Sequence, residues 1–211
     1  MESSLISSFK EFANYLIIYD EFDRNILIYF LCKSKHPNND LRILSFILDN
    51  IIRSCYNIIS SISILFKVIP TPQENNKMLT ILEEFSKIYV NINKNSEQSL
   101  LPNKDNSENN NLIANSNKET DNNIKLLNDL KFENSNSIFI LCCSIVSLNS
   151  LYHILSNKEK MPLREFVLIN RNLNSEYLKK VYDIVITNKL IKNETDCNII
   201  YYVYYEINLI I

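Results

Sequence analysis

Apolar residues recur every three or four positions along most of this chain, which is the spacing of one face of an α-helix. Residues 6–34 predict one or two helices, and two further patterns cover residues 41–51 and 58–69. A turn-rich break at residues 33–39, which contains Pro37, separates the first region from the second. The alternation typical of strands is scarce, so the first half predicts packed helices.

The second half continues in the same way after Pro70 and Pro72. A well-patterned helix is predicted over residues 78–89. Another over 138–152, capped by Ser135 or Ser137, is apolar nearly all round and is therefore expected at the centre. Pro162 begins a further helix, and Asn174 caps a last one. The fold class predicted is all-α, with eight to ten helices.

Two segments depart from this pattern. Residues 93–123 are roughly half Asn and Ser, and they carry too little apolar surface to offset the entropy of ordering. We expect a disordered insertion there, inside one helical domain of residues 1–190. Residues 191–211 form an apolar, Tyr- and Ile-rich tail whose role stays open, because its pattern fits a strand or a buried helix.

Composition excludes several classes of function. The net charge of −2 gives no electrostatic case for binding nucleic acid. The five cysteines form no CxxC pair and neither histidine lies near one in ligand spacing, so free thiols and no metal or cofactor are expected. There is no basic, apolar secretory start, and no uninterrupted apolar run long enough to span a bilayer. A cytoplasmic protein is expected.

The stretch Thr71-Pro72-Gln73-Glu74 has two interpretations. Locally it is a capping box, with Pro72 at the first helical position and Glu74 folded back onto the Thr71 N–H. That interpretation leaves Glu74 with a purely structural role. The alternative comes from a resemblance that spans both halves of the chain.

Residues 137–174 read SIFILCCSIVSLNSLYHILSNKEKMPLREFVLINRNLN. This segment resembles the second signature of the Sec-seven domain, the catalytic domain of exchange factors for Arf GTPases. That family has a long apolar helix ending in Leu-Asn-Thr-Asp-Leu-His, a loop to Lys-Met, a helix with Phe, and Asn-Asn-Arg-Gly-Ile-Asn. Matching residues stand in register without gaps: Leu148, Asn149, His153, Lys160, Met161, Phe166, Asn170, Arg171 and Asn174.

The family's first signature, Phe-Arg-Leu-Pro-Gly-Glu-Ala-Gln-Lys-Ile, lies over IPTPQENNKM at residues 69–78. Pro72, Glu74 and Lys77 coincide with its Pro, Glu and Lys. The resemblance covers most of residues 13–185 and implies an all-α superhelix of about ten helices.

The resemblance implies that Glu74 is a glutamate finger. In this family the finger enters the GTPase nucleotide site, displaces Mg²⁺ and repels the β-phosphate, so that GDP is released without bond chemistry. The implied partner is an Arf-family GTPase, and no cofactor is implied. The implied setting is vesicle traffic, with the protein peripheral on Golgi or other endomembranes. The expected GTPase-binding residues are Pro72, Gln73, Cys143, Ser147, Asn149, Met161, Asn170 and Arg171.

Local alternatives exist for these residues. A polar residue near a helix end, such as Asn149, often bonds nearby backbone, and His153 fits a packed, satisfied histidine. Met161 fits a core position, and Arg171 fits a structural salt bridge as well as a partner contact.

The chain also departs from the family pattern. Gln73 replaces the family's Gly, Pro70 and Thr71 replace Arg-Leu, Leu151 replaces Asp, and Ser147 replaces the groove methionine. These changes leave a second hypothesis open, a degenerate helical domain that binds a GTPase or another trafficking partner without catalysis. A hydrolytic or metal enzyme has no motif to support it.

Overall fold

The computed structural model describes residues 11, 14–15, 37–55, 57–69, 72, 75–98, 134–154 and 160–191, and its regular elements there are α-helices. They are α3 (Pro37–Arg53), α4 (Ile58–Val68), α5 (Asn75–Gln98), α7 (Ser135–His153), α8 (Leu163–Ile169) and α9 (Ser175–Thr187). The prediction of an all-α fold is confirmed. The helices predicted within residues 6–34 and the tail after residue 191 fall almost wholly outside the described residues.

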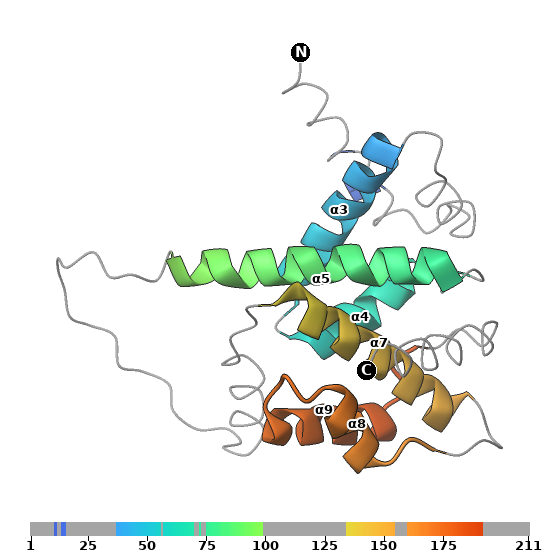
Figure 1. Ribbon diagram of the computed structural model, residues 1–211. Helices are drawn as coiled ribbons and strands as arrows, with labels where there is room; N and C mark the ends of the chain where they lie inside the picture. Colours follow the sequence, from blue (N-terminus) through green and yellow to red (C-terminus); the bar gives the residue numbers. More distant parts are fainter. Residues whose placement is uncertain are drawn as a thin grey trace, which may run out of the picture.

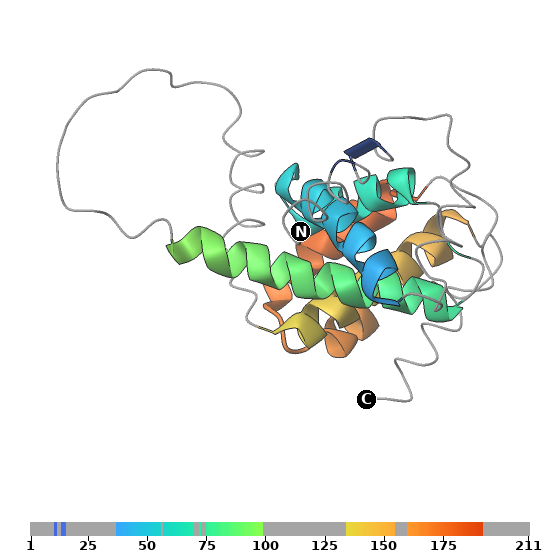
Figure 2. The ribbon, with the colours of Figure 1, turned by 90° about the horizontal axis from the view of Figure 1, so that it is seen from above.

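The long helix α5 is the centre of the arrangement (Figure 1). It packs against α3 on one side and against α7 on the other, and α7 in turn packs against α9 and α8. The helix α4 packs against α3. Seen from above, α5 runs past the end of this cluster with its C-terminal part extending away from it (Figure 2).

One continuous core joins these helices, and the predicted inward positions fill it. Leu44 and Ile47 of α3, Leu65 of α4, and Phe85 of α5 are 0% exposed. Residues 141–151 of α7 are all buried, which agrees with the central place predicted for this helix. By length and composition α7 could also cross a membrane, but 67% of that window is buried inside the protein. It is therefore best explained as the core helix of a helical domain.

The helix caps follow local chemistry. Asn174 caps α9, as predicted, since its Oδ1 accepts hydrogen bonds from the N–H groups of Glu176 at 2.9 Å and Tyr177 at 3.1 Å. The prediction for the α7 cap was wrong: Asn134, rather than Ser135 or Ser137, is the cap, and its Oδ1 accepts from Asn136 N at 2.8 Å. Asn is as good an N-cap as Ser, so composition could not decide between them.

Two predicted boundaries also move. Pro37 was placed in a break but opens α3, where its missing N–H costs nothing because the first helical N–H groups have no partner within the helix. The helix α5 continues to Gln98, into the Asn-rich stretch assigned to the insertion. Part of the reason is that Ile92 still packs on the core and Asn93 Nδ2 donates to Tyr89 O at 2.8 Å.

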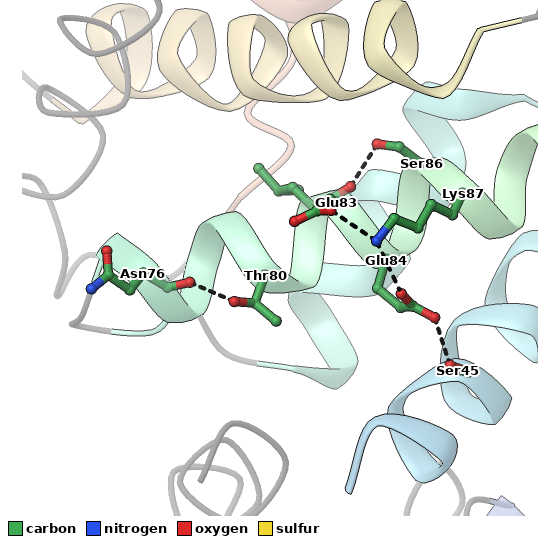
Figure 3. Close-up of polar contacts among 8 residues, drawn as sticks. Ser45, Asn76, Thr80, Glu83, Glu84, Ser86 and Lys87 are labelled. Atoms are coloured by element: carbon green, nitrogen blue, oxygen red, sulfur yellow. Dashed lines mark hydrogen bonds and ion pairs between the residues drawn. The ribbon is translucent and has the colours of Figure 1, made fainter. Parts of the chain in front are cut away.

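Polar contacts fasten the crossing of α3 and α5 (Figure 3). Ser45 Oγ donates to Glu84 Oε1 at 2.8 Å. Lys87 Nζ lies 2.8 Å from Glu83 Oε1 and 3.9 Å from Glu84 Oε2. Since Lys87 and Glu83 are exposed, these ion pairs contribute little to stability, and the apolar core supplies most of it.

Candidate functional site

The connection between α4 and α5 is held in the core at both ends. Asn57 caps α4, and Ile69 ends it in an extended conformation with its N–H bonded to Leu65 O at 2.7 Å. Ile69 and Met78 are 0% exposed, and Pro72 between them is buried. The connection is therefore seated on apolar anchors before and after the predicted finger.

The predicted finger residue, Glu74, and its neighbour Gln73 lie outside the described residues. Pro72 is not helical, and α5 begins at Asn75. Pro72 therefore does not take the first helical position that the capping-box interpretation gave it. The predicted bond between Glu74 and the Thr71 N–H stays a prediction.

The helix ends that flank the connection lie on the same side of the molecule as the end of α7. The C-terminal end of α4, the N-terminal end of α5 and the C-terminal end of α7 point to one side in both views (Figures 1 and 2). The helices α5 and α7, which carry parts of the two segments that resemble the family, also pack against each other.

All three predicted binding residues on α7 are inside the core. Cys143 is 0% exposed, Ser147 is 1% exposed and Asn149 is 0% exposed. Burial raises the pKa of the Cys143 thiol well above its ordinary value. Ser147 Oγ has no hydrogen-bond partner within the described part of the chain. These side chains shape the end of α7 from within.

Asn149 uses its carboxamide oxygen to hold another part of the chain. Its Oδ1 accepts hydrogen bonds from the backbone N–H of Leu190 at 2.8 Å and of Ile191 at 3.4 Å, just after α9. The side chain does bond backbone, as the local alternative predicted, but the partners are distant in sequence rather than near the helix end. Four residues further on, His153 Nε2 lies 2.8 Å from Val185 O. A carbonyl oxygen only accepts, so Nε2 carries the proton, and His153 is the packed, satisfied histidine predicted.

Met161 is 2% exposed, and its carbonyl is the meeting point of two tyrosines. Tyr182 Oη donates to Met161 O at 2.8 Å, Tyr152 Oη lies 3.3 Å from the same oxygen, and the two hydroxyl oxygens are 2.7 Å apart. Burial, followed by the hydrogen bond with Tyr152, raises the pKa of Tyr182. Lys160 Nζ lies 4.9 Å from the centre of the Tyr152 ring, over its face.

The turn between α8 and α9 separates two neighbouring predicted residues. Asn170 is 3% exposed and ends α8, with Nδ2 donating to Phe166 O at 2.8 Å and its own carbonyl accepting from Leu173 N at 2.9 Å. Arg171, the next residue, is exposed, and no ion pair is found for it among the described residues. Arg171 was predicted either to form a structural salt bridge or to contact a partner. Its exposure leaves it accessible to a partner.

Sequence reasoning missed the tyrosine pair and the segment after α9. No spacing signal joins Tyr152 to Tyr182, because the two residues lie on different helices. Ile191 was covered only as the start of the apolar tail, and Leu190 carried no prediction. Among the described residues no three His, Cys, Asp or Glu side chains gather in a way that could hold a metal ion.

A family model described as the Sec7 domain, the Sec-seven domain named above, matches residues 1–190. No curated protein matches the chain. A crystal structure of the Sec7p catalytic domain is similar in fold, with a TM-score of 0.56 at 16% sequence identity, over 86% of this chain and 80% of that chain. The family match covers most of the sequence, and the chain therefore belongs to the Sec7 domain family, whose members are exchange factors for small GTPases.

Proposed function

We propose that this domain promotes release of GDP from an Arf-family small GTPase, with the Glu74 carboxylate acting as a finger in the nucleotide site. The observation that supports it most is the seating of the connection between α4 and α5. Buried Ile69 and Pro72 precede Glu74, buried Met78 follows it, and the end of α7 lies on the same side. These buried residues fix the positions between which Glu74 lies in the chain.

The chemistry requires only a well-placed carboxylate. Mg²⁺ bridges nucleotide phosphate oxygens and offsets their charge. A carboxylate in its place removes that compensation and adds repulsion, which is strong in a poorly hydrated site. GDP is then bound less tightly, and no covalent bond changes.

The remaining predicted residues divide between two roles in this proposal. Exposed Arg171 contacts the GTPase directly. Buried Cys143, Ser147, Met161 and Asn170 fix the shape of the surface from inside. Gln73 and Pro72 present the finger, and Asn149 acts within the fold.

The test is release of fluorescent GDP from an Arf-family GTPase of the same organism, in excess Mg²⁺, with catalytic amounts of this protein. Glu74→Lys should abolish the acceleration. The matched control is Glu83→Lys, the same charge change at an exposed position of α5. Its rate should equal that of the wild type. Equal rates for wild type and Glu74→Lys would contradict the proposal.

A second candidate is a domain that binds a small GTPase without exchange. It is favoured by the residues around the finger, where Gln73 stands in place of the family's Gly, and by Ser147, which is buried where the family has a groove methionine. Titration calorimetry with GDP-bound and nucleotide-free GTPase separates the two. An exchange factor binds the nucleotide-free form far more tightly, whereas a simple binder shows no such preference.

We also propose that the protein is cytoplasmic and acts peripherally on Golgi or other endomembranes in vesicle traffic. The support for this location is the proposed partner, an Arf-family small GTPase. Fractionation of cell membranes tests this, because a peripheral protein is released by high salt or alkaline carbonate. Its retention after both treatments would contradict a peripheral association.

A further inference from the structure

The segment just after α9 lies between the two helices that border the candidate site. Asn149 Oδ1 on α7 accepts from Leu190 N at 2.8 Å and from Ile191 N at 3.4 Å. On the other side, Ser63 Oγ on α4 donates to Leu190 O at 3.4 Å. Leu190 therefore bonds α7 through its N–H and α4 through its carbonyl.

The bridge is buried where it meets α7. Asn149 is 0% exposed, Ile191 1% and Leu190 9%. Ser63 is half-buried. Because water does not compete at Asn149, breaking its hydrogen bonds would leave two buried N–H groups unsatisfied, which is costly. The segment therefore behaves as a fixed spacer between α4 and α7 rather than as a loose end.

The position of this spacer bears on function. The helix α4 leads directly into the connection that carries Glu74, and the end of α7 lies on the same side of the molecule. A change in the separation of α4 and α7 would move the finger relative to the surface against which a GTPase must dock. Small misplacements of this kind are known to lower reaction rates strongly.

We propose that Asn149 is a positioning residue: through the backbone of Leu190 and Ile191 it sets the separation of α4 and α7, and so the width of the GTPase-binding surface. This inference rests on the proposed exchange function for its catalytic consequence. Asn149 does not touch the partner, because its Oδ1 is occupied within the fold and its side chain is fully buried. The chain is then active only when residues up to Ile191 are in place.

The first experiment replaces the carboxamide by a side chain of similar size, Asn149→Leu. The matched control is Asn93→Leu, which removes a carboxamide whose Nδ2 donates within its own helix, to Tyr89 O at 2.8 Å. Hydrogen exchange of the Leu190 and Ile191 amides is measured first, since it needs no GTPase. We expect exchange at these amides to rise about tenfold or more in Asn149→Leu and to stay unchanged in Asn93→Leu.

GDP release is then measured at a temperature where each variant is fully folded. Asn149→Leu should lower the exchange rate about tenfold or more, because the GTPase binds more weakly and Glu74 is displaced relative to it. The same loss of GTPase affinity should appear in a Glu74→Lys background. A purely structural role would alter the melting temperature without altering affinity per folded molecule.

A milder variant keeps the proposal testable if Asn149→Leu does not fold. Ser63→Ala removes only the contact of α4 with Leu190, and Ser61→Ala is its control, because Ser61 Oγ bonds Asn57 O within the start of the same helix at 3.0 Å. Ser63→Ala should weaken GTPase binding by several-fold, whereas Ser61→Ala should leave it unchanged.

The outcomes are distinct. Unchanged amide protection in Asn149→Leu, or unchanged GTPase affinity in both Asn149→Leu and Ser63→Ala, would overturn the positioning role. Loss of both in Asn149→Leu supports it. If the wild-type protein binds the GTPase without releasing GDP, only the proposed exchange function is overturned. The positioning role of Asn149 is then tested by amide protection and GTPase affinity alone.

Discussion

The hydroxyl oxygens of Tyr152 on α7 and Tyr182 on α9 lie 2.7 Å apart. Tyr182 donates its proton to Met161 O at 2.8 Å, so Tyr152 is the donor within the pair. The two rings meet edge to face, at an interplanar angle of 82°. Together they fasten the chain before α8 to both α7 and α9.

This geometry predicts unequal effects of removing the two hydroxyls. Tyr182→Phe leaves the buried Met161 carbonyl without its shorter bond and should lower the free energy of unfolding by about 1–3 kcal/mol. Tyr152→Phe should cost less, about 1 kcal/mol, because Tyr152 is half-buried and its hydroxyl donates to Tyr182, so Met161 O keeps its hydrogen bond from Tyr182. Urea unfolding monitored by circular dichroism measures both. The double variant should cost less than the sum, and simple additivity would show that the hydroxyls act independently.

The buried phenols also predict a loss of stability in alkali. Burial is the main cause that raises the pKa of Tyr89, Tyr177 and Tyr182 in the folded protein. Below about pH 10, the ordinary tyrosine pKa, both states keep these protons and the phenols contribute no pH dependence. Above it the unfolded state loses protons that the folded state retains, so the free energy of unfolding falls, by about 1.4 kcal/mol per pH unit for each phenol.

Denaturant unfolding between pH 8 and pH 11.5 checks this expectation. Tyr177→Phe should give a shallower decline above pH 10, because one of the protonated phenols is gone. An equally steep decline in that variant would show that Tyr177 titrates normally in the folded state.

The cysteines predict a clear order of reactivity. Cys142 and Cys143 are 0% exposed, whereas Cys55 is half-buried, and all three are free thiols. Burial, before any other cause, raises the pKa of Cys142 and of Cys143, so little reactive thiolate forms. Iodoacetamide at pH 8 should label Cys55 at least about tenfold faster than either of them, as read by mass spectrometry of peptides. Labelling of Cys142 as fast as Cys55 in the native protein would be inconsistent with this core.

Much of the fold followed from the sequence because it depends on local periodicity. The spacing of Leu44, Ile47, Leu65 and Phe85 predicted helices whose inner faces are those observed. The ends of the helices were harder to predict, because one suitable side chain is enough to cap a helix and several often lie close together in the sequence. Asn134 and Ser135 are adjacent and chemically equivalent for that purpose, and only the backbone geometry selects the first.

The site could be predicted only in part, because its contacts join residues that are distant in sequence. Nothing in the neighbourhood of Asn149 indicates that its partners are the N–H groups of Leu190 and Ile191. Tyr152 and Tyr182 face each other only because α7 packs against α9. A resemblance between families gives the register of such residues but not whether a side chain points to the core or to a partner.

Arg171 offers the sharpest test of where the GTPase binds. It is exposed at the turn between α8 and α9, and it follows the buried residue Asn170. If it contacts the partner, Arg171→Glu reverses the charge at the rim of the interface. A rim charge acts mainly on the rate of association and on its salt dependence. We therefore expect a several-fold slower association and a weaker effect of salt.

The matched control is Arg164→Glu, the same change at an exposed position of α8. Both variants should keep the free energy of unfolding within about 0.5 kcal/mol of the wild type, since neither side chain is buried. Stopped-flow association with the GTPase at low and high salt distinguishes them. Equal association rates for the two variants would place the GTPase away from this turn. A slower rate for Arg171→Glu alone would extend the binding surface from the α4–α5 connection to the start of α9.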